Sequence, residues 1–288
     1  MKIKRSGRLV DMTYYMIQHP HELVPLTYFA ERYQSAKSSI SEDLGIIKQT
    51  FEESGVGTLL TVAGAAGGVK YIPTLAKEEA VAFIDELCQL FTKPERLLPG
   101  GYLYLTDILG NPALVKKIGL MFASLFATKK IDVVMTVATK GIPLAYAVAN
   151  YLDVPVVIVR RDSKVTEGST VSINYVSGSS KRIQTMLLAR RSLAVGSNVL
   201  IIDDFMKAGG TINGMVSLLE EFDATVAGIG VLVESEDEDI EERLVEDYYS
   251  LVQLSEVNLK EKAIEVIPGN FINHYKEMKV IDFGGENE

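Results

Sequence analysis

Cysteine, histidine and long apolar runs are scarce in this chain of 288 residues, and each scarcity excludes a class of protein. The single cysteine, Cys88, excludes an internal disulfide framework and a multi-cysteine zinc site, so we expect a setting that keeps thiols reduced, the cytosol. The three histidines, His19, His21 and His274, lack the spacing of metal ligands. The longest near-apolar run, residues 118–128, is far shorter than the roughly 18–20 residues of a membrane-spanning helix.

The overall composition is that of an ordinary globular protein. Hydrophobic residues make up 47% of the chain and charged residues 23%, which excludes large-scale disorder. The length predicts one large domain or two smaller ones. Residues 1–8 are polar and lead directly into an amphipathic segment, so no cleavable signal is expected.

Charge is distributed unevenly along the chain. The formal net charge is −9, but residues 1–74 contain eight Lys or Arg and seven Asp or Glu, a net +1, which leaves −10 for the remainder. Four of the positive charges fall within the first eight residues. An acidic protein with one basic end can bind nucleic acid, because phosphate neutralisation is local. The alternative is a basic end that is merely solvated.

The first 74 residues have the element order of a winged helix-turn-helix. Apolar spacing predicts a helix over residues 7–19, a short helix that Pro25 and Thr27 open, and a third helix after the serines of residues 35–41. Two strand-like runs, residues 57–62 and 69–73, flank a glycine-rich tip. The N-terminal end of the third helix suits entry into a major groove. A small α+β unit that binds no DNA is the alternative.

Basic and hydroxyl side chains at the start of the chain, at the third helix and on the hairpin are the candidates for DNA contact. They are Lys2, Lys4, Arg5, Arg8, Lys37, Ser38, Ser39 and Lys70. Residues 75–92 follow as an amphipathic helix, interpreted as a linker or a dimer-packing helix. Cys88 lies on its apolar stripe, which indicates a core thiol rather than a nucleophile.

From about residue 99 the pattern changes to apolar strands that alternate with helices. Strands are predicted at residues 133–137, 154–159, 199–202 and 226–233, and helices at 112–127, 142–151 and 211–222. Continuous Val and Ile runs of this kind indicate a parallel sheet covered on both faces, with ligands at the carboxyl ends of its strands. The acidic stretch 234–247 is interpreted as solvated surface.

Residues 199–211 (VLIIDDFMKAGGT) combine a buried strand, two carboxylates and a glycine pair that opens a helix. Glycines let backbone N–H groups surround a phosphate, and the N-terminal end of the following helix attracts it. Thr211 adds a hydroxyl donor. Asp203 and Asp204 can accept hydrogen bonds from the vicinal hydroxyls of a ribose, or help organise a hydrated Mg²⁺. Diol acceptors beside a monophosphate cradle specify a sugar phosphate.

This pattern resembles the 5-phosphoribosyl-1-pyrophosphate (PRPP) signature of type I phosphoribosyltransferases. The resemblance implies that residues 136–143 (TVATKGIP) form the pyrophosphate loop and that Tyr102 lies near the base side of the site. It also implies that Arg160 and Arg161 meet diphosphate, and that residues 162–182 form the flexible loop of the family. The effector-binding residues expected on this basis are Tyr102, Ala138, Thr139, Lys140, Gly141, Arg160, Asp203, Asp204, Phe205, Met206, Lys207, Ala208, Gly209, Gly210 and Thr211.

The same motif departs from the pattern of active enzymes at two positions. Ala208 stands where active purine enzymes usually carry a hydroxyl residue, so one phosphate donor is lost. Lys207 occupies a position that in hypoxanthine-type enzymes is an acid acting as general base, whereas a protonated lysine attracts phosphate instead. We therefore expect binding without turnover and no catalytic residue. A working purine phosphoribosyltransferase with an N-terminal dimerisation extension is the alternative.

The two halves together resemble the purine operon repressors of Gram-positive bacteria. The resemblance implies an α/β chain with a winged-helix DNA-binding domain at residues 1–74 and a type I phosphoribosyltransferase-like effector domain at residues 75–288. It further implies a cytoplasmic homodimer that binds double-stranded operator DNA of purine genes and is released by PRPP, with Mg²⁺ accompanying the effector. A guanine-nucleotide alarmone competing for the same pocket also fits the family. Activation rather than repression at some promoters is a third interpretation.

Overall fold

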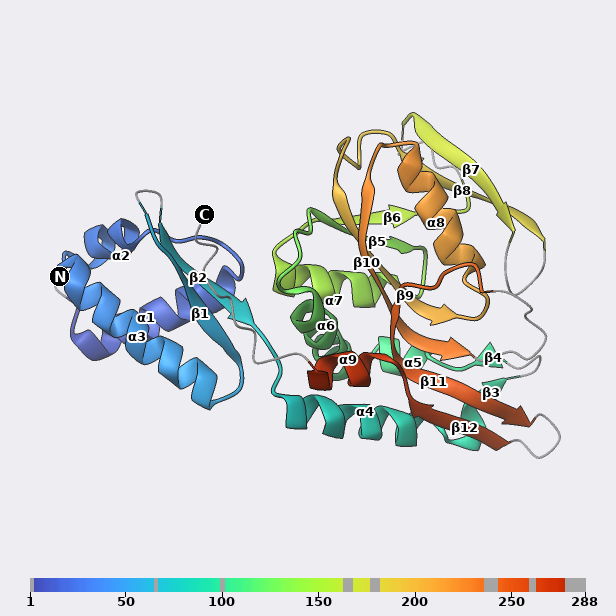
Figure 1. Cartoon of the computed structure of the whole chain (residues 1–288), viewed down its shortest axis with the longest axis horizontal. Coiled ribbons are helices and arrows are strands. Elements are labelled where there is room, and N and C mark those ends of the chain that lie inside the picture. Colours follow the sequence, from blue (N-terminus) through green and yellow to red (C-terminus); the bar gives the residue numbers. More distant parts are fainter. Residues whose placement is uncertain are drawn as a thin grey trace.

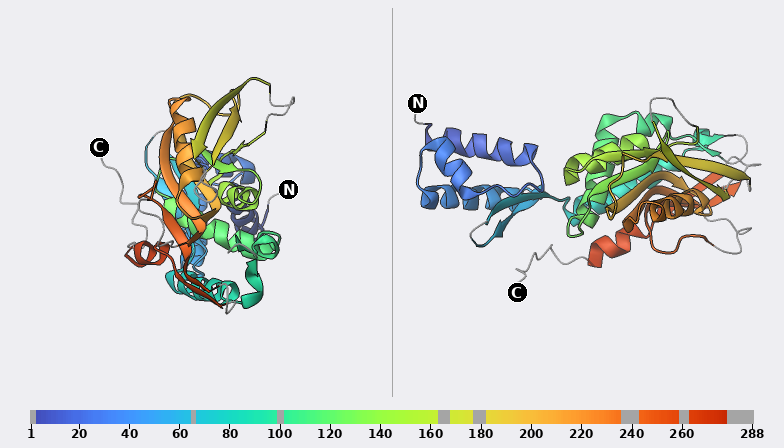
Figure 2. Two further views of the ribbon diagram at one scale, coloured as in Figure 1. Left: turned by 90° about the vertical axis from the view of Figure 1, so that its right-hand side faces the viewer. Right: turned by 90° about the horizontal axis from the view of Figure 1, so that it is seen from above.

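Two units, one small and one large, make up the chain. The structure is a computed structural model that describes residues 3–64, 67–98, 102–162, 168–176, 182–235, 243–258 and 263–277. The small N-terminal unit lies beside the larger one (Figure 1), and the view from above shows the same arrangement (Figure 2).

The N-terminal unit contains three helices and a hairpin in the expected order. Its elements are α1 (Arg5–Gln18), α2 (Leu26–Tyr33), α3 (Lys37–Glu53), β1 (Gly57–Val62) and β2 (Gly68–Pro73). The two strands pair antiparallel, and Gly57 lies opposite Pro73. Gln34 ends α2 in the left-handed conformation, with φ of 51°, and the chain turns there toward α3. The predicted winged helix-turn-helix is confirmed.

This unit has an apolar core of its own. Met12 and Met16 of α1, Phe29 of α2 and Ile40 of α3 are completely buried, and Leu59 of β1 closes the core from the hairpin side. The helical spacing of these side chains places them on the inner face of each helix. The stability of the unit therefore depends on contacts among its own elements. The inner face of α3 packs into this core, and the opposite face of the helix lies at the surface.

A six-stranded sheet forms the centre of the large unit. Its strands run in the order β12-β11-β10-β9-β5-β6. They are β5 (Val133–Val137), β6 (Val156–Val159), β9 (Asn198–Met206), β10 (Thr225–Ser235), β11 (Tyr249–Asn258) and β12 (Ala263–Pro268). All neighbours are parallel except β11 and β12. The expected parallel sheet is confirmed, with one antiparallel strand added at its edge.

Side chains alternate between the two faces of the sheet. Along β9, Leu200 and Ile202 join the core under α6 (Pro112–Phe126) and α7 (Ile142–Leu152), whereas Val199 and Ile201 join the core under α8 (Gly210–Glu220). Both faces are covered (Figure 1). This double burial explains why the strands are continuous runs of Val, Ile and Leu.

Several shorter elements complete the large unit. The helix predicted over residues 75–92 is α4 (Lys77–Phe91), whose buried face packs against β11, β12 and α9 (Phe271–Glu277). The remaining elements are η1 (Pro94–Arg96), β3 (Leu97–Leu98), β4 (Tyr102–Leu103) and α5 (Thr106–Leu109). Among the described residues, no helix combines the length and the apolar character needed to cross a membrane.

Part of the segment expected as a flexible loop is a regular hairpin. β7 (Thr170–Val176) and β8 (Ile183–Ala189) pair antiparallel along their whole length and cover α8. Residues 163–167 and 177–181 of the expected loop lie outside the described residues. Val171 and Tyr175 of β7 are buried, and Ser172 between them is exposed. The many serines and glycines of this region favoured a loop over a strand in the sequence pattern.

The two units are joined at Leu75, directly after the wing strand β2. The N–H of Leu75 donates to Ser124 Oγ of α6 at 3.1 Å, and its carbonyl accepts from the hydroxyl of Tyr275 in α9 at 2.5 Å. Leu75 itself is buried in the core of the large unit. Leu75, two residues after the last strand of the wing, is thus anchored to the core of the large unit by two hydrogen bonds.

Candidate functional site

The carboxyl end of β9 carries a pair of carboxylates with different exposure. Asp203 is buried at 3% exposure, and Asp204 is half-buried. The strand continues through both residues to Met206, past the end predicted at Ile202. The N–H of Asp204 donates to Asp203 Oδ1 at 3.0 Å. The pair is therefore held by strand geometry, and one carboxylate is left accessible to a ligand.

Burial dominates the electrostatics of this pair. It raises the pKa of Asp203 well above its ordinary value, and the charge of Asp204 raises that pKa further. Burial also raises the pKa of Asp204, although the nearby positive charge of Lys140 opposes that shift. The charge of Arg161 lowers both values. Hydrogen-bond donors from a ligand, such as the hydroxyls of a sugar, would stabilise the ionised forms of both groups.

A tight turn and a helix N-terminus follow the carboxylates. Gly209 has φ of 79°, a left-handed conformation that glycine adopts without strain, and α8 begins at Gly210. Thr211 and Lys207 are half-buried beside the turn. Helix N-termini with glycine turns bind phosphate groups through backbone N–H groups. The side chain of Met206 is buried in the core, so only its backbone can belong to the site.

A second loop, between β5 and α7, reaches the same sheet edge. Ala138 and Thr139 follow β5, their peptide bond is cis, and Lys140 is exposed. Gly141 packs so closely that a Cβ there would lie 2.1 Å from Thr136 Oγ1 and 3.1 Å from Asp203 Oδ1. The structure therefore brings this predicted loop against the predicted carboxylates, and no side chain fits between them.

Thr136 was part of the predicted motif but was not selected as a site residue. Its hydroxyl is buried and has no hydrogen-bond partner among the described residues. Buried polar atoms without partners are uncommon in folded proteins and often mark functional sites. The burial of the Thr136 hydroxyl against Gly141 depends on the fold, so the sequence alone does not mark Thr136 as a site residue.

Basic residues from β6 and its connection border the same edge. Arg160 pairs through its backbone with Leu187 of β8, so the hairpin returns to the end of β6. Arg161 is exposed, and its charge acts on both carboxylates. Phe205 is half-buried against the core. The backbone of Tyr102 begins β4, but its side chain lies outside the described part of the structure.

The N-terminal unit presents a second, separate surface. Lys37 and Ser38 are exposed at the first turn of α3, Ser39 is half-buried there, and Lys4 is exposed at the start of α1. Lys70 lies half-buried on β2. Lys2, also expected to contact DNA, lies outside the described residues.

Both predicted DNA-binding arginines are engaged within the protein. Arg8 donates from Nε to Asp43 Oδ2 at 2.5 Å and from Nη1 to Ser35 Oγ at 2.8 Å, and its side chain is only 11% exposed. Arg5 donates to Asp43 Oδ1 at 2.8 Å but remains 55% exposed. These bonds attach α1 to α3 and the preceding turn. Arg8 therefore has a structural role here, and Arg5 retains an exposed guanidinium for phosphate.

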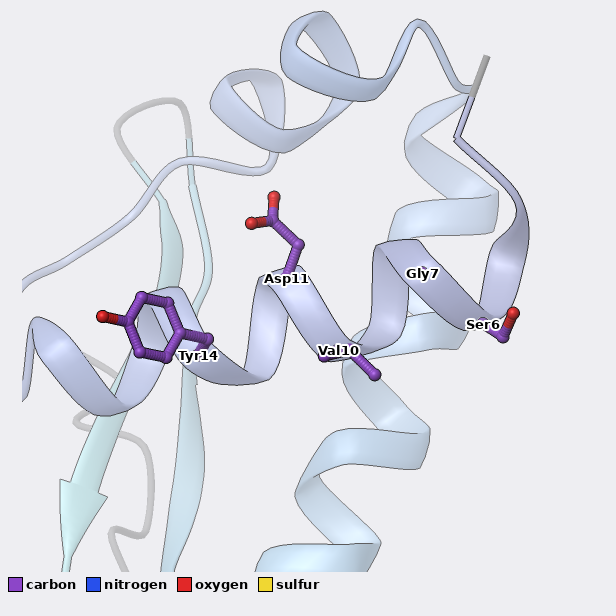
Figure 3. Close-up of a pocket in the computed structure, with 5 residues that line it drawn as sticks. All are labelled: Ser6, Gly7, Val10, Asp11 and Tyr14. Carbon is purple, nitrogen blue, oxygen red and sulfur yellow. The ribbon is translucent and has the colours of Figure 1, made fainter. Parts of the chain in front are cut away.

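A shallow hollow on α1 contrasts with both surfaces. Ser6, Gly7, Val10, Asp11 and Tyr14 line it (Figure 3). Val10 is 70% exposed and Tyr14 is 65% exposed. Its one carboxylate, Asp11, already accepts from Arg32 and Tyr33, which lowers its pKa. The hollow has neither the convergent donors nor the depth of a polar ligand site.

A winged-helix unit attached to an α/β unit of phosphoribosyltransferase type defines a DNA-binding regulator built on a transferase fold. Residues 4–73 match the family described as bacterial purine repressor, N-terminal, and residues 105–266 match the phosphoribosyl transferase domain. The chain belongs to the purine repressor family of bacterial transcriptional regulators.

Individual relatives agree over nearly the full length. The chain is 70% identical over 277 residues, 96% of each chain, to the purine biosynthesis transcriptional repressor PurR of Bacillus subtilis (strain 168). It is 49% identical over 271 residues, 94% of this chain and 99% of the relative, to the purine biosynthesis transcriptional activator PurR of Lactococcus lactis subsp. lactis. Among solved structures, the adenine phosphoribosyltransferase of Thermoanaerobacter pseudethanolicus matches with a TM-score of 0.50 at 21% identity. That match covers 58% of this chain and 98% of the enzyme, and it shows the fold of the large unit.

Proposed function

We propose that this protein represses purine synthesis and transport genes and that PRPP, bound at the β9 edge, releases it from DNA. The observation that carries the proposal is the convergence of the Asp203–Asp204 pair, the Gly209 turn and the Gly141 loop at one sheet edge. The winged-helix unit on the same chain supplies the DNA-binding function. The name of the Bacillus relative supports repression.

Each part of PRPP has a counterpart among these residues. The ribose hydroxyls would donate hydrogen bonds to Asp203 and Asp204. These hydrogen bonds would favour the ionised form of each buried carboxyl group, which is the better acceptor. The 5-phosphate would occupy the turn at residues 207–211, opposite the N-terminal end of α8. The diphosphate would lie against residues 138–141, where Lys140, Arg160 and Arg161 add positive charge.

Effector binding without catalysis follows from the same residues. Lys207 supplies positive charge where a transferase of the hypoxanthine type needs a base, and Ala208 lacks a hydroxyl. The relatives that match nearly the whole chain are named as transcriptional regulators, which also supports a non-enzymatic role. The Lactococcus relative is named an activator, so the position of the operator decides the sign of regulation.

Mg²⁺ would enter with the effector. The described residues contain no cluster of three or more His, Cys, Asp or Glu that could hold a metal ion. Mg²⁺ commonly combines one or two carboxylates with water and substrate phosphates, and the half-buried Asp204 beside a bound diphosphate suits that mode. A guanine-nucleotide alarmone carries diphosphates and a ribose of similar chemistry and would compete for the same residues.

Release requires that PRPP bind the free form of the protein more tightly than the DNA-bound form. We propose a homodimer that binds paired operator elements through both winged helices. Either movement of the β7–β8 hairpin or the added negative charge would supply the difference in affinity.

A promoter gel shift tests the function directly. The protein should retard purine-gene promoter fragments, and PRPP with Mg²⁺ should release them. In a parallel assay with adenine, guanine, hypoxanthine or xanthine, no nucleotide should form from PRPP. Nucleotide formation without any effect of PRPP on DNA binding would support the transferase alternative instead.

Gly141→Ala is expected to weaken PRPP binding about tenfold and to cost about 1–3 kcal/mol of stability. The new methyl group would lie 2.1 Å from Thr136 Oγ1, so the diphosphate loop must move away from Asp203. Calorimetric titration and thermal unfolding measure the two effects. Gly45→Ala is the control, because a Cβ there meets nothing within 4 Å. Unchanged affinity in Gly141→Ala would remove the 138–141 loop from the site.

A further inference from the structure

A buried carboxylate, Glu234, lies one strand away from the proposed phosphate turn, residues 207–211. It stands near the end of β10, is 4% exposed, and pairs in register with Met206 at the end of β9. The sequence interpretation placed it in a solvated acidic stretch, and that is wrong for Glu234. A carboxylate this deeply buried requires partners, because an unpaired charge in the interior is strongly destabilising.

Glu234 has three hydrogen-bond partners, two from segment 243–248 and one from β11. Arg243 Nη1 donates to Oε2 at 2.7 Å, the hydroxyl of Tyr248 donates to the same oxygen, and Ser250 Oγ donates to Oε1 at 2.7 Å. Asn270 extends the network, because its Nδ2 donates to the carbonyl of Tyr248 and its Oδ1 accepts from the N–H of Ser250. The irregular segment 243–248 is thereby fixed at both of its ends.

The segment 243–248 contacts the phosphate turn directly. The N–H of Leu244 donates to the carbonyl of Ala208 at 3.2 Å. Val245 is buried, and its Cγ2 lies 3.1 Å from where a Cβ of Gly209 would stand. The C=O and N–H of a trans peptide point in opposite directions. Holding the Ala208 carbonyl toward Leu244 therefore aims the N–H of Gly209 away from this segment.

We propose that Glu234 and Arg243 are positioning residues for the 5-phosphate cradle. Through segment 243–248 they hold the Ala208–Gly209 peptide in the orientation that presents its N–H to the phosphate. Neither residue contacts the ligand, so they act by preorganising a donor that otherwise must be ordered on binding. This inference rests on the proposed function. The hydrogen bonds of the network given above do not include the proposed pyrophosphate loop at residues 138–141, so we expect changes to the network to affect binding of the 5-phosphate and not of pyrophosphate.

Two variants test the positioning role, and thermal unfolding of each reports its effect on stability separately from its effect on binding. Glu234→Gln keeps the size of the side chain but removes the ion pair and leaves a single oxygen, which can accept either from Ser250 or from Tyr248. Arg243→Met removes the cation from a side chain that is 32% exposed, and Arg243→Lys restores it. Glu246→Gln is the matched control, because Glu246 is an exposed carboxylate in the same segment.

Calorimetric titrations should use PRPP, ribose 5-phosphate and pyrophosphate as separate probes. We expect Glu234→Gln and Arg243→Met to weaken PRPP and ribose 5-phosphate about tenfold and to leave pyrophosphate unchanged. Arg243→Lys should recover most of the loss, and operator affinity without effector should stay within about twofold in every variant.

Three results would overturn the inference, and one of them separates it from the proposed function. Normal ribose 5-phosphate affinity in both variants would show that the network does not position the turn. Equal loss of ribose 5-phosphate and pyrophosphate would indicate a general disturbance of the large unit rather than positioning. If the unsubstituted protein fails to bind PRPP, the proposed function itself fails, and the inference fails with it.

Discussion

Replacing Asp203 and Asp204 together by asparagine is expected to abolish release from DNA by PRPP. A hydrogen bond to a charged acceptor contributes about 1.5–3 kcal/mol, so losing two charged acceptors lowers effector affinity about a hundredfold or more. Asparagine is preferred to alanine at Asp203, because this side chain is buried and its removal would leave a cavity beside Gly141. Operator binding without effector should be unchanged, since the pair lies in the large unit.

Fluorescence anisotropy of labelled operator DNA, with PRPP titrated into the complex, measures this effect. Glu221→Gln, an exposed carboxylate at the far end of α8, should behave like the unsubstituted protein. If the double variant still releases DNA at the same PRPP concentration, the carboxylate pair is not the ribose site. Loss of operator binding in the absence of PRPP would contradict the separation of the two surfaces.

Asp43→Ala is expected to destabilise the winged-helix unit by about 3–5 kcal/mol and to abolish DNA binding. The Asp43 side chain has no exposed surface and accepts hydrogen bonds from both Arg5 and Arg8. Its removal leaves the largely buried Arg8 without a carboxylate partner and removes the hydrogen bonds between α1 and α3. The start of α3, where Lys37 and Ser38 are exposed, then loses its support.

The neighbouring residue provides the control. Glu42 is 71% exposed and lies 3.7 Å from Arg5, so Glu42→Ala should change stability by about 0–1 kcal/mol. Thermal unfolding and operator anisotropy measure both variants, and PRPP titration should show an intact pocket in each. Full operator affinity in Asp43→Ala would mean that the Arg8–Asp43 pair does not hold the DNA-binding surface.

Local periodicity was sufficient to predict most of the elements. The apolar faces of α1 to α3, the alternation of strands with helices and the glycine-rich wing tip all follow from spacing within a few turns of chain. The end of β9 was placed too early, because Asp203 and Asp204 were expected to terminate a strand that in fact carries them to Met206. The residue type alone does not distinguish an aspartate that is buried within a strand from an aspartate that follows the end of the strand.

The turn at residues 207–211 and the start of α8 were predictable because the strand, the glycine pair and the helix are contiguous in the chain. Contacts between residues that are distant in the chain were not predictable from the sequence. Arg8 and Asp43 are 35 residues apart, and Arg8 therefore appeared as a free cation for DNA. The contact of Val245 with Gly209 joins an acidic stretch to the turn across the β9–β10 pairing. The buried state of Glu234 depends on the same pairing, so its charge predicted solvent exposure instead.

PRPP and operator DNA are proposed to bind the same chain, and each is expected to weaken the binding of the other. Paired calorimetric titrations test this coupling most directly. PRPP with Mg²⁺ is titrated into the free protein and into the protein saturated with operator DNA. Thermodynamic reciprocity requires that bound DNA lower PRPP affinity by the same factor by which PRPP lowers DNA affinity. We expect measurable binding of PRPP to the free protein and a clear loss of PRPP affinity in the DNA complex. Equal affinity in both titrations, or no binding to the free protein, would contradict it.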